Sequence, residues 1–248
     1  MVKKLFEILN GAFNRLILRL FSSRSGTGSG VHKFIWNIGK KSEVYYQENF
    51  VKNLDVNLFC NPDSELQDYI KNLIYIPNGS VPKILDVGAG PVTMLGKKWN
   101  GKLIDITAVD PLAIKYNEIL NKNNIQPPVR TQVGYAEKLT EQFDENSFDI
   151  VHAINSLDHC FNPVEALRQM LKVVKRDSYV VLYHSTNEGI RHNYSGLHQW
   201  NFYEDSGCFF INNSKMQINI NKEFESKAVV NSKMMDGGVY LLVTLKKK

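Results

Sequence analysis

From residue 82 onward, short apolar runs alternate with segments whose apolar positions recur at helical spacing. The apolar runs predict strands over residues 83–88, 103–109, 129–133, 148–154 and 179–185. The periodic segments predict helices over residues 92–98, 112–122 and 163–174. Three further extended segments complete the chain, over residues 215–220, 224–230 and 239–245. Because alternating strands and helices form parallel sheets with right-handed crossovers, we predict an α/β fold: a Rossmann-like, doubly wound, mostly parallel seven-stranded sheet with a C-terminal antiparallel hairpin, preceded by N-terminal helices.

The chain before this pattern divides into two parts. Residues 1–21 place apolar side chains at helical spacing among basic ones, which predicts an amphipathic helix, and the Ser- and Gly-rich composition that follows is typical of a flexible linker. Residues 31–80 hold aromatic segments interrupted by Gly39 and Pro62, which predicts short helices. The expected organisation is therefore an amphipathic helix and linker at 1–30, a helical cap at 31–80 and an α/β domain at 81–248 with an insertion at 187–213.

Charge and cysteine content narrow the functional classes. The net charge of +5 lies at the chain ends, since residues 1–24 hold five basic residues and one acidic residue and the last three residues are lysines. The remaining body is mildly acidic, which does not favour a nucleic-acid groove, so we expect no nucleic-acid partner. Three widely spaced cysteines fit a reducing compartment, and we expect a cytoplasmic protein.

The sequence of the first 21 residues does not decide whether this segment contacts a membrane. No run of 18 or more uncharged apolar residues predicts a transmembrane helix. An amphipathic helix with basic residues can pack or self-associate, lie on an anionic membrane surface, or serve as a transit peptide. Self-association or a peripheral membrane contact through residues 1–21 is the expected role of this segment.

The first predicted strand runs into Asp86, Gly88 and Gly90, a spacing typical of a tight strand-to-helix turn. Such a turn lets backbone N–H groups and a helix N-terminus approach a ligand closely. A carboxylate before the first glycine would repel a pyrophosphate, whereas it suits a ligand with an ammonium or sulfonium group. S-adenosylmethionine carries both. The second strand ends in Asp110, where a carboxylate can accept hydrogen bonds from both ribose hydroxyls, a position shared with nicotinamide-binding folds.

Residues 82–186 resemble the class I S-adenosylmethionine-dependent methyltransferases, in particular the small-molecule (type 11-like) group. The most specific part of the resemblance is Asp-x-Gly-x-Gly at residues 86–90, followed by the stretch 148–182. The resemblance implies that Asp86, Gly88 and Gly90 line the methionine moiety and that Asp110 binds the ribose. Val92 departs from the pattern, because it replaces a third glycine that is common in the family.

The same resemblance implies further contacts with S-adenosylmethionine. Ala136 and Glu137 would lie at the adenine edge, and Asn155 and Ser156 would close over the sulfonium side. Tyr135 departs from the pattern, because it stands where an aspartate often meets the adenine amine. Residues 187–202 and 109–113 also resemble uncharacterised methyltransferases associated with bacterial surface-polysaccharide synthesis.

Histidines gather in the second half of the chain. Five of the six fall within 47 residues, at or after the last two parallel strands: His152, His159, His184, His192 and His198. They can be hydrogen-bonded structural residues, metal ligands together with Glu188 or Asp158, or a general base with substrate-binding neighbours. Because no two of them have a tight spacing on one helix, we assign no metal ligands.

The chemistry of methyl transfer explains why a base is wanted. A neutral hydroxyl is a poor nucleophile until its proton is removed, and imidazole is suited to that near neutral pH. His159 and His198 are the predicted bases, with Asp158 or Glu188 as the orienting partner. An anionic acceptor oxygen would need no base, and basic side chains would then neutralise and position it. The predicted substrate-binding residues are Arg191, His192, Tyr194 and Trp200.

The sequence thus predicts an S-adenosylmethionine-dependent methyltransferase that yields S-adenosylhomocysteine. The expected reaction is O-methylation of a polar small molecule, such as a sugar, a nucleotide-linked sugar or a phosphate-containing metabolite, in bacterial capsule or surface-polysaccharide synthesis. A NAD(P)-dependent oxidoreductase is the first alternative, disfavoured by Asp86 and by Pro91 at the start of the expected phosphate-binding helix. The second alternative is a noncatalytic Rossmann-like partner protein.

Overall fold

The structure is a computed structural model that describes residues 29–76 and 80–248. The amphipathic helix predicted over residues 1–21 lies outside the described residues, as do residues 22–28 of the predicted linker. Ser29 and Gly30, also predicted as linker, are the first residues of helix α2 (Ser29–Lys52). Within the two described ranges, no helix has the length and apolar character needed to cross a membrane.

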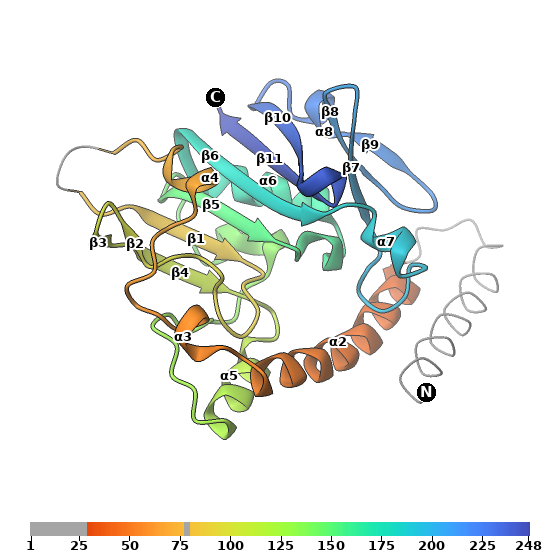
Figure 1. Cartoon of the computed structure of the whole chain (residues 1–248). Coiled ribbons are helices and arrows are strands. Elements are labelled where there is room, and N and C mark those ends of the chain that lie inside the picture. The colour runs from red at the N-terminus through yellow and green to blue at the C-terminus, as the bar shows by residue number, and fades with distance from the viewer. Residues whose placement is uncertain (1–28, 77–79) are drawn as a thin grey trace.

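A six-stranded sheet forms the centre of the molecule, in the order β10-β11-β6-β5-β1-β4 (Figure 1). Four strands run parallel: β4 (Asp105–Val109), β1 (Lys83–Val87), β5 (Phe148–Ile154) and β6 (Val174–Ser185). The hairpin of β10 (Ala228–Met235) and β11 (Tyr240–Lys247) pairs antiparallel with β6 and turns through η3 (Asp236–Gly238). This confirms the predicted mostly parallel α/β fold and its C-terminal hairpin.

Both faces of the sheet are buried, because successive side chains of a strand point to opposite faces. Val151 of β5 belongs to the core cluster that contains helix α6 (Pro163–Val173). Its neighbour Ile150 belongs to a second cluster with Ile70 of helix α4 (Asp68–Lys71). Strands enclosed on two faces read as continuous apolar runs, which is why the sequence identified them.

The predicted helix over residues 92–98 is wrong. These residues form a loop that ends in β2 (Lys98–Trp99), paired with β3 (Lys102–Leu103). Backbone groups of Lys97 and Lys98 bond to Ser64 and Leu66 instead of to one another. Gly96 permits this close approach, because a Cβ there would lie 2.0 Å from the carbonyl oxygen of Glu65.

The strand predicted over residues 129–133 is reduced to isolated bridges. Gln132 pairs in parallel with Val109 at the edge of the sheet, and Arg130 pairs with Val92. The main sheet of the described residues therefore has six strands where the sequence predicted seven.

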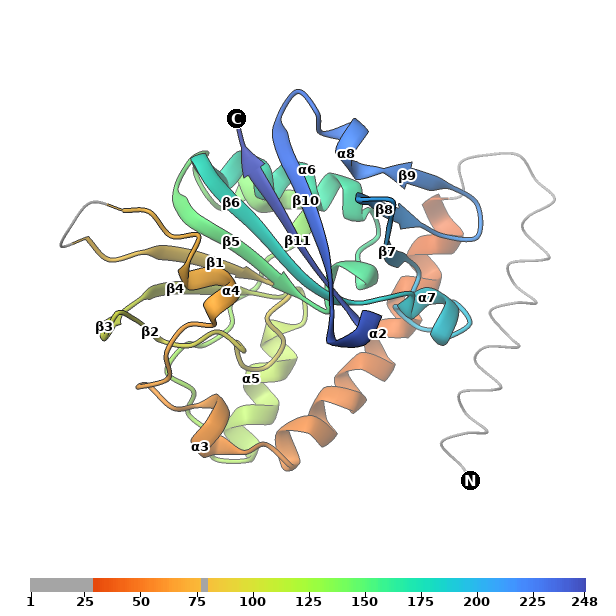
Figure 2. The same cartoon turned by 45° about the horizontal axis from the view of Figure 1, so that its top comes forward.

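The predicted insertion at 187–213 contains a turn of helix, α7 (Glu188–Arg191), and two strands. Strands β7 (Asn201–Asp205) and β8 (Cys208–Asn212) form an antiparallel sheet with β9 (Gln217–Asn219), followed by helix α8 (Ile220–Glu223). Figure 2 shows this small sheet beside the C-terminal hairpin. The insertion is thus folded against the main sheet.

Helix α2 connects two distant parts of the molecule (Figures 1 and 2). At its C-terminal end Val51 packs in one cluster with Tyr116 of helix α5 (Ala113–Lys122). Farther toward its start, Gly39 lies against Leu197 in the segment between α7 and β7. Since α5 follows β4 and α7 follows β6, α2 passes from one end of the parallel strands' carboxyl edge to the other. The remaining helical turns are α3 (Val56–Phe59), η1 (Ala136–Glu141) and η2 (Leu157–His159).

Candidate functional site at the carboxyl ends of the strands

The turn after β1 depends on glycine at two positions. Gly88 has φ +71° and Gly90 has φ +65°, in the left-handed region that side chains rarely adopt. A Cβ on Gly88 would lie 2.4 Å from the Cβ of Ser156, whose hydroxyl donates to the carbonyl of Val87 at 3.0 Å. The end of β5 therefore packs directly on the turn after β1.

Asp86 faces the protein interior. Its side chain has no exposed surface, and its two oxygens accept hydrogen bonds from Thr93 Oγ1 at 2.5 Å and from His152 Nδ1 at 2.8 Å. The other ring nitrogen of His152 lies 3.3 Å from the hydroxyl of Tyr69. Protein donors therefore bond to both oxygens of Asp86, and its contact with a cationic ligand stays a prediction. The expected helix N-terminus after the turn is absent, since residues 92–98 form a loop.

Asp110 occupies the end of β4 with little solvent around it. Its carboxylate accepts from the backbone N–H of Leu112 at 2.8 Å and of Gly90 at 3.2 Å. Burial raises the pKa of Asp110 to about 6, although these two hydrogen bonds oppose the shift. The carboxylate is thus fixed beside the glycine turn, where it can accept hydrogen bonds from a diol.

Two side chains of α2 that the sequence analysis missed reach the same region. The Gln47 amide nitrogen lies 4.0 Å from the position of a Cβ on Gly90, and it donates to Glu43 at 2.8 Å. After burial, which is the largest influence on both groups, the charge of Glu43 contributes to the raised pKa of Asp110 and of His198. Glu43 is therefore near both the glycine turn and the histidines. The sequence signal for this pair was the i,i+4 spacing of Glu43 and Gln47, which places them on one face of a helix.

The residues predicted for the adenine edge have different surroundings. Ala136 is buried. Glu137 Oε1 accepts from the backbone N–H of Phe161 at 2.9 Å and of Asn162 at 3.2 Å, ahead of α6. Tyr135 is 42% exposed. The carboxylate of Glu137 is thus used to order the loop that precedes α6.

Asn155 also has a local role. It has φ +43° and its side-chain oxygen accepts from the backbone N–H of Ser185 at 2.7 Å, which ties the end of β5 to the end of β6. Asn155 and Ser156 consequently shape the edge where the predicted sulfonium side would lie.

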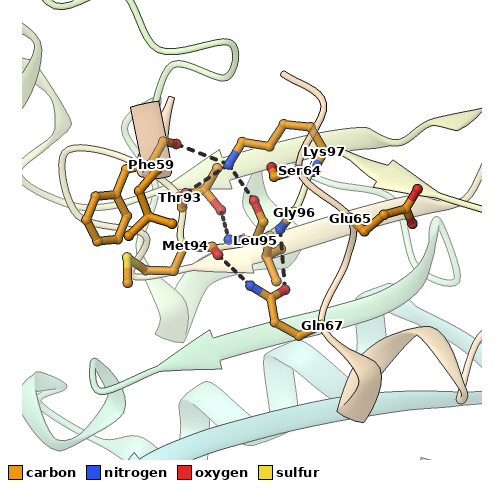
Figure 3. Close-up of a pocket in the computed structure, with 10 residues that line it drawn as sticks. Phe59, Ser64, Glu65, Gln67, Thr93, Met94, Leu95, Gly96 and Lys97 are labelled. Carbon is orange, nitrogen blue, oxygen red and sulfur yellow. Dashed lines mark hydrogen bonds between the residues drawn. The ribbon is translucent and has the colours of Figure 1, made fainter. Parts of the chain in front are cut away.

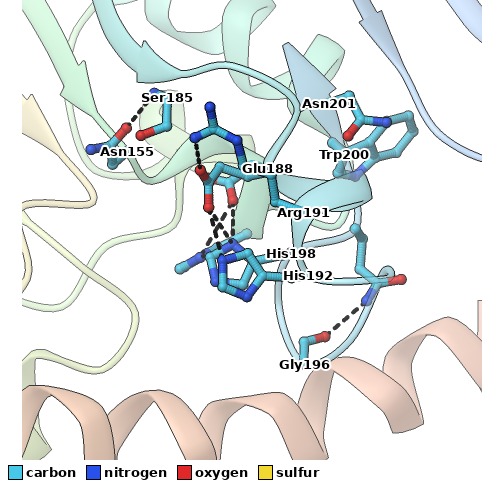
Figure 4. A network of polar contacts seen from close by, with 12 residues as sticks. Asn155, Ser185, Glu188, Arg191, His192, Gly196, His198, Trp200 and Asn201 are labelled. Carbon is cyan, nitrogen blue, oxygen red and sulfur yellow. Dashed lines mark hydrogen bonds and ion pairs between the residues drawn. The ribbon is translucent and has the colours of Figure 1, made fainter. Parts of the chain in front are cut away.

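Five predicted side chains converge beyond this edge: Asp158, His159, Glu188, His192 and His198. His198 Nδ1 lies 2.7 Å from Asp158 Oδ2 and 3.1 Å from His159 Nε2. His192 Nε2 lies 3.1 Å from Glu188 Oε2, and its ring stacks on that of His198 at 4.0 Å between centroids. Figure 4 shows the two stacked imidazoles below Glu188. The histidines come from η2 and from the segment after α7, so sequence spacing could not reveal their convergence.

The charges in this cluster are mutually dependent. Burial would raise the pKa of Asp158, but the charges of His159 and His198 and the hydrogen bond from His198 hold it well below its ordinary value. Burial lowers the pKa of His198, and Asp158 more than offsets this, so the net direction is upward. Burial and the charge of His198 lower the pKa of His192. Asp158 therefore orients and stabilises the protonated form of His198.

The other two histidines of the predicted group do not join the cluster. His152 is bonded to Asp86 and Tyr69. His184 is buried against Phe202, and burial lowers its pKa to about 4. Both imidazoles are parts of the core.

Of the predicted substrate-binding residues beyond His192, one reaches the histidine cluster and two do not. Arg191 is exposed and pairs with Glu188 at 3.2 Å, so it reaches the cluster through that carboxylate. Trp200 is buried, with its indole N–H bonded to the carbonyl of Cys160 at 3.1 Å. The hydroxyl of Tyr194 accepts from the side chain of Asn201 at 2.9 Å. Tyr194 thus holds the insertion together and Trp200 ties it to the segment after η2, and Figure 4 shows Trp200 apart from the imidazoles.

A cavity of about 380 Å³ lies between α3, the segment 64–67 and the loop at 93–97 (Figure 3). The amine of Lys97 is buried beside it, bonded to the carbonyls of Phe59, Thr93 and Leu95, and burial lowers its pKa. None of the predicted site residues lines this cavity. Its connection to the site is Thr93, whose hydroxyl bonds to Asp86.

Comparison with known proteins identifies the domain. Residues 85–182 match a family model described as a methyltransferase domain. Among curated proteins, none matches the chain. The family match includes the glycine turn, Asp110 and all of β5, and it selects the methyltransferase interpretation over the oxidoreductase.

Solved structures share the fold at low identity. One is a chain of the complex between a Haloferax volcanii methyltransferase activator and the protein assigned as its methyltransferase, with 11% identity, TM-score 0.51, and coverage of 84% of this chain and 95% of that one. A protein from Pyrococcus horikoshii OT3 has 18% identity and TM-score 0.42, covering 69% and 84%. The CurJ carbon methyltransferase has 14% identity and TM-score 0.49, covering 70% of this chain and 50% of that one.

Proposed function

Given that this chain is an S-adenosylmethionine-dependent methyltransferase, we propose that it transfers the methyl group to an oxygen atom of a polar small molecule. The observation that carries the proposal is the hydrogen-bonded set of Asp158, His198 and His159 after β5. A neutral hydroxyl needs to lose its proton as the C–O bond forms, and an imidazole oriented by a carboxylate performs that step in many enzymes.

The proposed place of S-adenosylmethionine is the carboxyl edge between β1, β4 and β5. Gly88 and Gly90 leave room for the methionine moiety, and Asp110 accepts from the ribose hydroxyls. Asn155 and Ser156 border the sulfonium side, and the adenine lies toward residues 135–137. Methyl transfer is an in-line displacement, so the acceptor oxygen must sit about 3 Å from the methyl carbon on the side away from sulfur.

The proposed acceptor site is the histidine cluster and the insertion that carries half of it. His159 or His198 removes the proton, and Asp158 stabilises the imidazolium that results. Glu188, Arg191 and His192 supply further polar groups at the exposed side of the cluster. Polar hydroxylated compounds match these groups, which supports a sugar, a nucleotide-linked sugar or a phosphate-containing metabolite as the acceptor.

We extend the proposal to bacterial surface-glycan synthesis on the resemblance of residues 187–202 and 109–113 described above. In this proposal the helical cap at 31–80 and the insertion at 187–213 are the parts that determine the acceptor, and the α/β domain binds the donor. Residues 1–21 would provide a membrane or self-association contact.

A screen for release of S-adenosylhomocysteine tests the proposal. Sugars, sugar nucleotides and sugar phosphates are each incubated with the full chain and S-adenosylmethionine, with matched amines and thiols as comparison acceptors. The expected result is turnover with a hydroxylated acceptor, reduced about 100-fold or more by His198→Gln. Turnover confined to amines or thiols, or unchanged in that variant, contradicts it.

A further inference from the structure

Three ligand-type atoms from two separate segments meet at one point of the histidine cluster. Asp158 Oδ2, His159 Nε2 and His198 Nδ1 are separated by 2.7, 3.1 and 3.5 Å. Ligand atoms that surround a tetrahedral zinc-sized ion at about 2.0–2.2 Å lie roughly 3.3–3.6 Å from one another. The 2.7 Å separation is a hydrogen bond between Asp158 and His198, which the ion would replace by moving the two atoms apart by roughly 0.6 Å. We propose that Asp158, His159 and His198, completed by Glu188, bind a divalent first-row transition-metal ion such as Zn²⁺.

Glu188 is positioned to provide the fourth side-chain ligand. Its Oε2 lies 4.0 Å from His198 Nδ1, slightly more than the separation that a shared ion would impose. Its other oxygen is paired with Arg191 at 3.2 Å, and His192 Nε2 lies 3.1 Å from Oε2. Outer partners of this kind orient metal ligands in proteins. His192 and Arg191 are therefore positioning residues for Glu188 in this proposal.

The surroundings of Asp158 favour a cation. Its side chain is 5% exposed, and within the described residues every cationic group paired with it is an imidazole. A buried carboxylate needs a countercharge, which a protonated imidazole supplies in the free protein and a bound metal ion could supply in its place. A divalent ion between Asp158 and Glu188 would balance both carboxylates and use the imidazoles as neutral ligands.

The two segments that carry the ligands are fastened together beside them. The backbone N–H of Gln199 donates to the carbonyl of Asp158 at 3.3 Å. The indole of Trp200 donates to the carbonyl of Cys160 at 3.1 Å. These bonds flank His198 and His159 respectively, so the chain holds the donor atoms close before an ion arrives, which reduces the cost of assembling a site.

The donor set determines which ions fit. Two imidazole nitrogens and two carboxylate oxygens suit Zn²⁺, Mn²⁺, Fe²⁺ or Co²⁺. Mg²⁺ and Ca²⁺ prefer oxygen ligands alone, and so should bind poorly.

An ion at this position would take part in the proposed methyl transfer. The role of the ion in turnover rests on the proposed function, whereas the binding of the ion does not. The ion would hold the acceptor oxygen and lower the pKa of its hydroxyl, whose proton would pass to solvent. His159 and His198 would then act as ligands, in place of acting as bases.

Metal binding to the untagged full chain tests the inference without any acceptor. Chelator-treated protein is titrated with Zn²⁺ by calorimetry and with Co²⁺ by visible absorption, with Mg²⁺ for comparison. We expect one Zn²⁺ or Co²⁺ per chain and a Co²⁺ spectrum of low coordination number.

The variants His159→Asn, His198→Gln and Asp158→Asn should each weaken metal binding by more than about 100-fold, and His192→Asn by roughly tenfold. Glu145→Gln, at an exposed carboxylate before β5, is the control and should leave binding unchanged.

Two results would overturn the metal site: no saturable binding of Zn²⁺ or Co²⁺ to folded protein, or equal affinity in the wild type and in the folded His159→Asn and His198→Gln variants. Circular dichroism establishes that each variant is folded. Oxygen methylation at the full rate by protein without bound metal refutes the role of the ion in turnover and leaves the proposed function intact. Specific metal binding by protein that methylates no oxygen acceptor would support the metal site and refute the proposed function.

Discussion

Gly39 of α2 lies so close to Leu197 of the insertion that a Cβ at position 39 would be 2.7 Å from Leu197 Cδ2. It would also be 3.0 Å from the carbonyl carbon of Gly196. The helix and the segment that carries His198 are therefore in backbone-level contact. Because α2 also brings Glu43 and Gln47 to the glycine turn, this one contact links the position of the donor site to that of the histidine cluster.

Replacing Gly39 tests this link. Gly39→Val should destabilise the protein by about 1–3 kcal/mol, because the added methyl groups force the insertion away from α2. Thermal unfolding measures the loss, and Lys41→Val on an exposed position of the same helix is the control. Equal melting temperatures for the two variants would show that the contact has no energetic consequence.

Gly88 and Gly101 form a matched pair for the turn after β1. Both have positive φ, +71° and +74°, but a Cβ on Gly101 would meet nothing within 4 Å. Gly101→Ala should therefore cost only the backbone strain, about 1–2 kcal/mol. Gly88→Ala should cost about 1–3 kcal/mol more, because its Cβ overlaps Ser156.

Adding Ser156→Gly to Gly88→Ala should recover part of the second cost. Chemical denaturation of the single and double variants provides the free energies of unfolding. A double variant no more stable than Gly88→Ala would exclude the overlap as the cause.

The charge of Glu43, near the glycine turn, should favour a cationic donor. Glu43→Gln should weaken S-adenosylmethionine binding about tenfold, which corresponds to about 1.4 kcal/mol. Glu48→Gln is the control on the next turn of α2, where the carboxylate pairs with Lys52 and Lys122. Calorimetric titration measures both affinities, and the same affinity for the two variants would remove Glu43 from the donor site.

Asp110 predicts a pH dependence of donor binding. With a pKa of about 6, its carboxylate loses its charge below that pH and can no longer accept two ribose hydrogen bonds. The affinity for S-adenosylmethionine should fall as the pH decreases from 7 to 5, and Asp110→Asn should abolish the change. A pH profile that is unchanged in Asp110→Asn would assign the dependence to another group.

The same residue affects stability in the opposite direction. The folded-state pKa is raised above the ordinary value of 3.8, so its stabilising contribution is present below that value and is lost as the pH rises through about 6. The stability of the free wild type should therefore fall by on the order of 1–3 kcal/mol as the pH rises from 4 to 7, and Asp110→Asn should lack this part of the pH dependence because its amide does not titrate. The same pH dependence in Asp110→Asn would mean that the carboxylate is not penalised by burial.

The sequence was sufficient for the parts of the fold that local patterns encode. Enclosed strands such as β5 appear as apolar runs, and Gly88 marks a turn that only glycine can make. The helix predicted over 92–98 failed because Gly96 allows that segment to pair with residues 64–66, a contact between distant positions that local periodicity does not contain.

The residues of the candidate site also divide into those that local sequence predicted and those that only the folded structure revealed. Asp110 was found from its place after a strand, whereas the enclosure of Asp86 by Thr93 and His152 required the packed structure. Glu43 was missed because it comes from a helix outside the α/β pattern. His159 and His198 were predicted as alternatives, and the structure shows that they lie 3.1 Å apart.

The identity of the methylated atom tests the central claim most directly. Product made from S-adenosylmethionine with a ¹³C-labelled methyl group is analysed by NMR, for the wild type and for His198→Gln. The account predicts a methyl carbon bonded to oxygen and a product yield reduced about 100-fold in the variant. A methyl group on carbon or nitrogen, or an undiminished yield from His198→Gln, would contradict it.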